Sequence, residues 1–185
     1  MPPDPLPRRS AVTARARRPA ARPAAKKLKP CGHAAASSRA GRAAPRGGGQ
    51  GPLSTVTICV DGASRGNPGA AAIGVLVLAD HSMVREIAER IGVATNNVAE
   101  YKALLRGLDE AASLGASTVH IQSDSELLVR QIQGKYKVRN EALIPLYREA
   151  LARLKRFDHV HIFHVPRTRN SGADGLANRA LDAKT

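Results

Sequence analysis

Three strand-like segments follow one another with short connections, and helix-like segments then alternate with two further strand-like segments. The first segment with apolar residues at helical spacing begins at residue 97, where the alternating pattern of the first three strands has ended. The expected order is strands at 55–60, 70–78 and 83–91, a helix from 97 that stops at Gly115, a strand at 118–122, helices at 126–132 and 140–156, a strand at 159–165 and a last helix at 171–181. Short connections favour antiparallel pairing, whereas helical crossovers favour parallel pairing. The sequence therefore predicts an α/β fold in which helices flank a mixed five-stranded sheet of three antiparallel and then two parallel strands.

Four carboxylates stand where these predicted elements begin or end. Asp61 follows the first strand, and Glu100 lies at the start of the first helix. Asp124 lies between a strand and a helix, and Asp174 lies in the first turn of the last helix. Each position also has an ordinary structural explanation. Asp61 could belong to an Asp-Gly turn, and Glu100 could form a capping box with Asn97. Asp124 could cap a helix, and Asp174 could be a favourable charge at a helix start.

The functional interpretation is a joint one. Side chains at strand ends and helix starts can converge on one edge of an open sheet, where ligands usually bind. Four like charges at close quarters would repel one another and raise their pKa values unless a cation neutralised them. Carboxylate oxygen is a ligand that Mg²⁺ and Mn²⁺ prefer, and a pair of such ions can promote attack on a phosphodiester. The sequence therefore predicts a divalent-metal site that acts on a polyanion.

The segments around the carboxylates are VDGASRGNPG, NNVAEYKALLRGL, IQSDSELL and HVPRTRNSGADGLA. In this order and at this spacing they resemble the successive motifs of type 1 ribonuclease H, and the resemblance covers residues 55–181. It implies the ribonuclease H-like fold, catalysis by two Mg²⁺ ions with Mn²⁺ as a substitute, and endonucleolytic cleavage of the RNA strand of RNA–DNA hybrids to leave 5′-phosphate and 3′-hydroxyl ends. It also implies that the metal-binding catalytic residues are Asp61, Glu100, Asp124 and Asp174.

The resemblance further implies contacts with the substrate. Asn67, Asn96 and Asn97 match positions that touch the hybrid in its minor groove, where amides suit 2′-hydroxyls and base edges. Thr95 matches a position that contacts a DNA phosphate. A turn or helix-cap role remains the alternative for each asparagine.

Two residues compete for a role in proton transfer or product release. His164 lies ten residues before Asp174, but within a predicted strand, where a structural role is the alternative. Arg167 lies seven residues before Asp174 in a loop that resembles a compact branch of the family. We favour Arg167, which would act through its permanent charge. The segment GKYKVRN replaces the basic protrusion of larger relatives, so this segment or the N-terminal region would have to offset the lost contacts.

Residues 1–53 are expected to form a disordered basic arm rich in Ala, Arg and Pro, preceding a catalytic domain at 54–185. Within this arm, residues 1–50 hold twelve Lys or Arg and one Asp, and no aromatic residue, which is too little apolar surface for a core. Such an arm would attract nucleic acid through phosphates. A transit peptide and an inert low-complexity segment remain alternatives.

The leading hypothesis is a metal-dependent endoribonuclease for RNA–DNA hybrids, with double-stranded RNA left open as a second substrate. Another nuclease of the same fold and a binding module without catalysis remain the alternatives. A binding module should have lost one or more of the carboxylates, whereas this chain keeps all four. We find no apolar stretch long enough for a membrane span and no signal-peptide core, so we expect a cytoplasmic protein, and we expect it to be a monomer.

Overall fold

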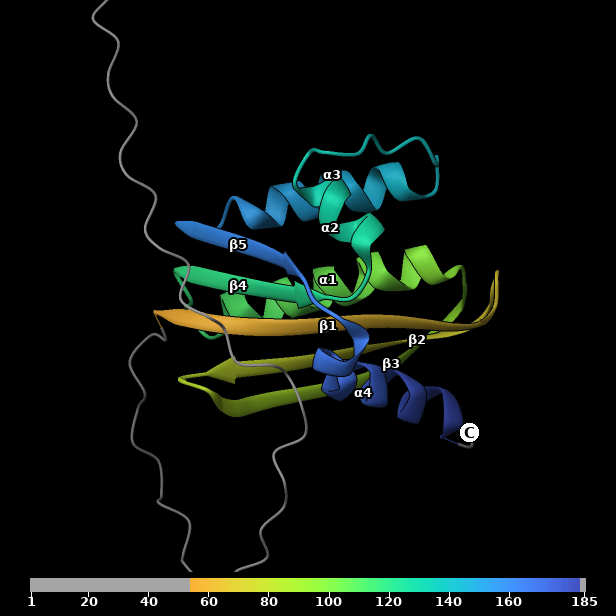
Figure 1. Ribbon diagram of the computed structural model, residues 1–185, viewed down its shortest axis with the longest axis horizontal. Helices are drawn as coiled ribbons and strands as arrows, with labels where there is room; N and C mark the ends of the chain where they lie inside the picture. The colour runs from red at the N-terminus through yellow and green to blue at the C-terminus, as the bar shows by residue number, and fades with distance from the viewer. Residues whose placement is uncertain (1–53, 184–185) are drawn as a thin grey trace, which may run out of the picture.

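The computed structural model describes residues 54–183, and the predicted arm at 1–53 lies outside the described residues. Five strands form a single sheet in the order β3-β2-β1-β4-β5 (Figure 1). These strands are β1 at Thr55–Gly66, β2 at Gly69–Ala79, β3 at Ser82–Ala94, β4 at Thr118–Ser123 and β5 at His159–His164. β1, β2 and β3 pair antiparallel, whereas β4 pairs parallel with both β1 and β5. The predicted mixed five-stranded sheet is confirmed.

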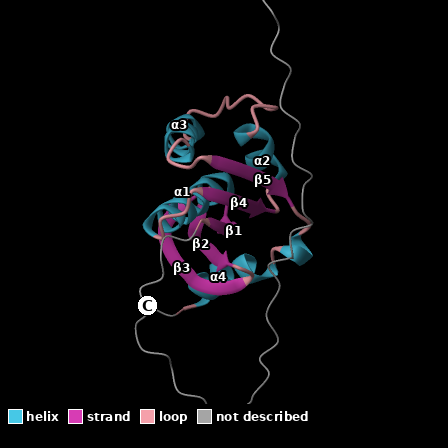
Figure 2. Ribbon diagram, turned by 90° about the vertical axis from the view of Figure 1, so that its left-hand side faces the viewer, coloured by secondary structure: helices cyan, strands magenta, loops and turns pink. Residues whose placement is uncertain are grey.

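Helices cover both faces of this sheet. They are α1 at Asn96–Ser113, α2 at Glu126–Ile132, α3 at Leu143–Leu154 and α4 at Ser171–Asp182, with a short 3₁₀ turn, η1, at Arg167–Arg169. On one face, alternate residues of β1 such as Ile58 pack with Leu104 and Leu108 of α1 in the main core. On the opposite face, Leu76 of β2 packs with Leu176 of α4. Figure 2 shows α1 and α4 on opposite sides of the central strands.

The main difference from the sequence prediction concerns β1. The predicted strand ends at residue 60, but β1 continues to Gly66 because its pairing with β2 runs on without interruption to Gly66 and Gly69. Asp61 therefore lies within a strand and not in an Asp-Gly turn, and the turn is displaced to residues 67 and 68.

A smaller difference concerns α3, which begins at Leu143 instead of residue 140. The side chain of Asn140 accepts a hydrogen bond from the main-chain N–H of Ala142 at 2.9 Å. An asparagine bonded in this way forms a turn before the helix, because it offers the backbone an alternative to helical bonding. Among residues 54–183, no helix combines the length and apolar character that crossing a membrane requires.

Candidate active site

The parallel pairing of β1 and β4 brings the first two carboxylates together. Cys59 is level with Gln122 in this pairing, and two residues further along each segment are Asp61 and Asp124. After burial, the nearby charge of Asp124 is the largest cause that raises the pKa of Asp61. Asp61 is buried and Asp124 is half-buried.

Glu100 reaches the same place because α1 begins against β1. A Cβ atom at Gly62 would stand 2.2 Å from the main-chain nitrogen of Glu100, so only glycine permits this approach. The cap of α1 is Thr95, whose side chain accepts a hydrogen bond from Val98, so the capping box predicted as the alternative for Glu100 is not formed. Instead, Oε2 of Glu100 is buried without a hydrogen-bond partner.

Asp174 arrives from the other face of the sheet. Gly74 of β2 is the register partner of Asp61, and a Cβ atom there would stand 2.0 Å from the main-chain oxygen of Ala173. This glycine lets the first turn of α4 lie directly on the sheet beside Asp61. Nη2 of Arg167 is 2.5 Å from Oδ1 of Asp174.

Asp124 is not the cap of α2. That cap is Ser125, whose side chain accepts from the main-chain N–H of Leu128 at 3.4 Å. The helix-cap explanation for Asp124 is therefore wrong, whereas Asp174 does lie in the first turn of its helix and benefits from the helix dipole as well.

Burial and mutual repulsion dominate the electrostatics of this cluster. Burial, followed by the charges of Asp124 and Asp174, raises the pKa of Asp61 from its ordinary value of 3.8 to about 8. Burial, followed by the charges of Asp61 and Asp124, raises the pKa of Glu100 well above its usual range. The charge of Arg167 opposes both increases. Without a cation, a pKa of about 8 keeps Asp61 largely protonated at neutral pH.

The donor set fits a divalent cation chemically. All four side chains offer hard carboxylate oxygens, and the buried Oε2 of Glu100 lacks any partner. Within residues 54–183, however, no three acidic, His or Cys side chains already stand in a metal-ligating arrangement. The ion pair of Asp174 with Arg167 engages one carboxylate oxygen, which would have to exchange this partner for a cation.

The residues predicted to contact substrate lie around the start of α1. The side-chain oxygen of Asn67, in the turn after β1, accepts from the main-chain N–H of Asn96 at 3.1 Å. Asn96 and Asn97 are exposed in the first turn of α1. Structural roles thus account for the side chains of Asn67 and Thr95, while those of Asn96 and Asn97 remain open to solvent.

His164 and Arg167 both lie near the carboxylates. Nε2 of His164, at the end of β5, is 3.2 Å from the main-chain oxygen of Asp124. Arg167 in η1 contacts the carboxylate of Asp174 directly and has 74% of its side chain exposed.

Asn170 is a residue of the site that the sequence prediction missed. It is fully buried, and its Nδ2 donates to Oδ1 of Asp124 at 2.8 Å and to the main-chain oxygen of Val60 at 3.0 Å. The available signal was its place directly before the last predicted helix, but that position indicates a cap and not a contact with Asp124.

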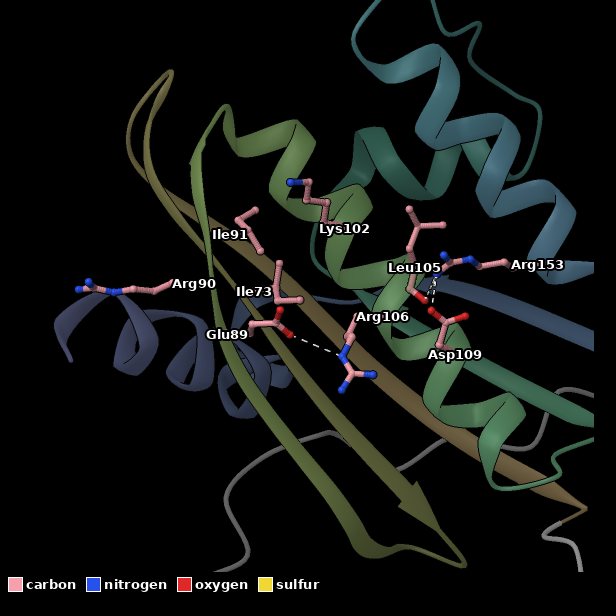
Figure 3. A pocket seen from close by; sticks show the side chains of 9 residues that line it. All are labelled: Ile73, Glu89, Arg90, Ile91, Lys102, Leu105, Arg106, Asp109 and Arg153. Atoms are coloured by element: carbon pink, nitrogen blue, oxygen red, sulfur yellow. Dashed lines mark hydrogen bonds and ion pairs between the residues drawn. The ribbon is translucent and has the colours of Figure 1, made fainter. Parts of the chain in front are cut away.

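A separate hollow of about 340 Å³ lies between β2, β3 and α1 (Figure 3). Its lining consists of Ile73, Glu89, Arg90, Ile91, Lys102, Leu105, Arg106, Asp109 and Arg153. The charges of Arg106 and Arg153 are already paired with carboxylates of the same region. Because none of the four clustered carboxylates lines it, this hollow is not part of the candidate active site.

Comparison with known proteins agrees with this geometry. The sequence profile described as reverse transcriptase-like matches residues 59–180. Ribonuclease HI of Halobacterium salinarum is 46% identical over 123 residues, which cover 66% of this chain and 62% of that protein. The crystal structure of that organism's RNase H1 has a TM-score of 0.68 at 43% identity and covers 69% of this chain and 98% of the solved one. The chain belongs to the ribonuclease H family.

Two further relatives of this ribonuclease H-like chain are informative. The bifunctional protein Rv2228c of Mycobacterium tuberculosis is 49% identical over 130 residues, which cover 69% of this chain. The chain spans only about a third of that relative, 36% of its length. LC11-RNase H1, isolated from compost by a metagenomic approach, has been solved in complex with an RNA/DNA hybrid. That structure has a TM-score of 0.66 at 38% identity, and the match covers 69% of this chain and 96% of the solved one. Membership of the ribonuclease H family implies a divalent metal, and the chemistry of the carboxylate cluster is compatible with one.

Proposed function

We propose that this chain is a metal-dependent endoribonuclease that hydrolyses the RNA strand of RNA–DNA hybrids and leaves 5′-phosphate and 3′-hydroxyl ends. One observation carries the proposal: carboxylates from β1, α1, the end of β4 and α4 couple electrostatically at one place, with two of them buried. Burying such a group costs free energy unless a partner compensates it. The hybrid-bound structure of the LC11 relative supports the choice of substrate.

In this proposal Asp61, Glu100, Asp124 and Asp174 hold two Mg²⁺ ions, with Mn²⁺ as a substitute. Two bound ions would supply Lewis-acid stabilisation of the charge that develops on the phosphodiester and on its leaving oxygen. The chain itself supplies a rigid frame, because strand pairing and the close approaches at Gly62 and Gly74 fix the segments that carry the carboxylates.

The substrate would lie across the start of α1. Asn96 and Asn97 are exposed there, and their amides can both donate to and accept from 2′-hydroxyls and base edges. Asn67 and Thr95 would contribute to the same surface beside their structural bonds. Arg167, at the edge of the cluster, would stabilise negative charge during the reaction, and His164 is the weaker candidate for this role. The proposal takes the enzyme to be a monomer that acts in the cytoplasm.

A cleavage assay with matched variants tests this function. Purified full-length protein is incubated with labelled RNA–DNA hybrid, RNA duplex, DNA duplex and single strands, in Mg²⁺, Mn²⁺ or chelator. We expect cleavage of the hybrid's RNA strand in either metal and none in chelator. Asp61→Asn and Asp124→Asn should each lower the rate by about 10²–10³-fold or more, the size of effect seen when one preorganised electrostatic group is removed.

The control is Asp158→Asn, which removes one negative charge at an exposed position outside the cluster. It should cleave like the unaltered protein. Full activity in both Asp61→Asn and Asp124→Asn would refute the proposal, and cleavage of DNA substrates alone would support another nuclease of the same fold. Binding of the hybrid without cleavage in any metal would indicate a binding module.

A further inference from the structure

Asn170 lies between η1 and α4. In this part of the chain the backbone passes from β5 to the helix on the opposite face of the sheet (Figure 1). Its side chain is completely buried. Its two side-chain hydrogen-bond partners are distant in sequence, since Val60 is 110 residues away and Asp124 is 46 residues away. A polar side chain placed in this way connects separate elements, so its bonds can decide how those elements meet.

The chemistry of the two partners fixes the orientation of the Asn170 amide. The main-chain oxygen of Val60 and the carboxylate oxygen of Asp124 are both acceptors, at 3.0 and 2.8 Å, so only the NH₂ group can face them. The amide oxygen consequently points elsewhere and is buried without a partner. An unpaired buried acceptor is costly, which means that the two donated bonds must offset that cost.

Helix capping does not explain this arrangement. An asparagine at the start of a helix ordinarily accepts a hydrogen bond from a main-chain N–H of the first turn. Asn170 occupies the cap position of α4 but makes no side-chain capping bond. Its main-chain oxygen alone serves the helix, by accepting from the N–H of Asp174 at 3.1 Å.

These bonds connect three of the four carboxylate-bearing segments. The bond to Val60 holds β1 directly before Asp61, the bond to Oδ1 of Asp124 holds that carboxylate itself, and the main-chain bond holds Asp174. A donor on one oxygen of Asp124 restricts the rotation of the carboxylate and stabilises its charged form. Partners of this kind orient the groups that bind a metal.

We propose that Asn170 is a positioning residue that orients the carboxylate of Asp124 and locks β1, the end of β4 and α4 into the geometry that receives divalent cations. The role rests on the proposed function, because it assigns Asn170 to the same metal-dependent site. Asn170 touches neither substrate nor the reacting atoms in this role and acts only through Asp124 and the two neighbouring segments.

The test compares Asn170→Ala, which removes both donors, with Asn178→Ala. Asn178 lies in α4, which Asn170 precedes, and its amide donates to the main-chain oxygen of Asp174 at 2.9 Å. Binding of Mg²⁺ to each full-length variant is measured by calorimetry without substrate, and kcat and KM are measured with the RNA–DNA hybrid. Folding is checked by circular dichroism in chelator.

For Asn170→Ala we expect Mg²⁺ binding about 10-fold weaker or more, and a kcat lowered by about 10–100-fold at saturating metal with little change in KM, as is typical for groups that support metal ligands. Asn178→Ala should leave both measurements unchanged. If Asn170→Ala binds Mg²⁺ and turns over like the unaltered protein, or if only its KM rises, the proposal is overturned.

Asn170→Ser serves as a second variant, because serine is an equally good helix cap but is too short to span both partners. If Asn170→Ala does not fold, the same criteria apply to Asn170→Ser. If neither variant folds, Asn170 is a structural residue and the proposal is overturned. Unaltered protein that binds Mg²⁺ but cleaves no hybrid would refute the proposed function, while the calorimetric comparison would still decide the role of Asn170.

Discussion

Replacing Asp61 by asparagine should make the metal-free protein more stable, and more so as the pH rises. Burial and the nearby charges of Asp124 and Asp174 raise the pKa of Asp61 from 3.8 to about 8. The folded protein therefore holds this proton up to about pH 8, whereas the unfolded chain releases it near its ordinary pKa. Between these values the unfolded state binds fewer protons, so the stability of the metal-free protein falls as the pH rises. Asparagine has a similar shape and cannot ionise, so Asp61→Asn lacks this loss.

The size of the effect follows from the same pKa. A rise from 3.8 to about 8 corresponds to an upper limit of about 6 kcal/mol at 1.36 kcal/mol for each unit. Relaxation of the surroundings and entry of water reduce such penalties, so we expect a stabilisation of about 2–4 kcal/mol near pH 8. Near pH 4.5 the difference should shrink to about 1 kcal/mol or less, because this pH lies less than one unit above the ordinary pKa of 3.8 and little of the loss has yet accumulated.

Urea denaturation in chelator, followed by circular dichroism across this pH range, measures the effect. Asp158→Asn, at an exposed position, is the control and should differ from the unaltered protein by no more than about 0.5 kcal/mol. Adding Mg²⁺ should stabilise the unaltered protein, most strongly near pH 8, and Asp61→Asn much less. A variant no more stable than the unaltered protein near pH 8, or a difference that does not change with pH, would refute the argument that the cluster is an uncompensated set of buried acids.

Three further predictions concern the frame of the site, its edge and the N-terminal region. Gly74→Ala should destabilise the protein by about 3 kcal/mol or more, because its methyl group would stand 2.0 Å from a main-chain oxygen of α4. Urea denaturation measures this, and a stability within about 0.5 kcal/mol of that of the unaltered protein would contradict the close contact. Arg167→Ala should lower kcat for the hybrid by about 10–100-fold and more than His164→Ala does, because only the arginine contacts a carboxylate of the cluster; the reverse ranking would favour the histidine. Deleting residues 1–53 should weaken hybrid binding and flatten its dependence on salt concentration, and an unchanged salt slope would remove the predicted phosphate contacts.

The sequence by itself predicts the kinds of element, their order and the chemistry of the site. Apolar periodicity is a local property, so the five strands and four helices can be located from residues that neighbour one another in the chain. The carboxylates can also be proposed as a set, because Asp61, Glu100, Asp124 and Asp174 each lie at or near the start or end of such an element and recur in the order of a known family.

Only the tertiary structure decided how these elements meet. The sequence placed Asp61 just after a strand, with an Asp-Gly turn as the alternative, but pairing with β2 carries β1 past it to Gly66. From the sequence, Gly62 belonged to a possible turn and Gly74 to an apolar strand. In the structure, α1 approaches the sheet at Gly62 and α4 approaches it at Gly74. The two side-chain bonds of Asn170 join residues that are 46 and 110 positions away from it. Contacts of this kind depend on strand register and on the packing of helices against the sheet, which arise between distant segments and leave no periodic pattern in any one of them.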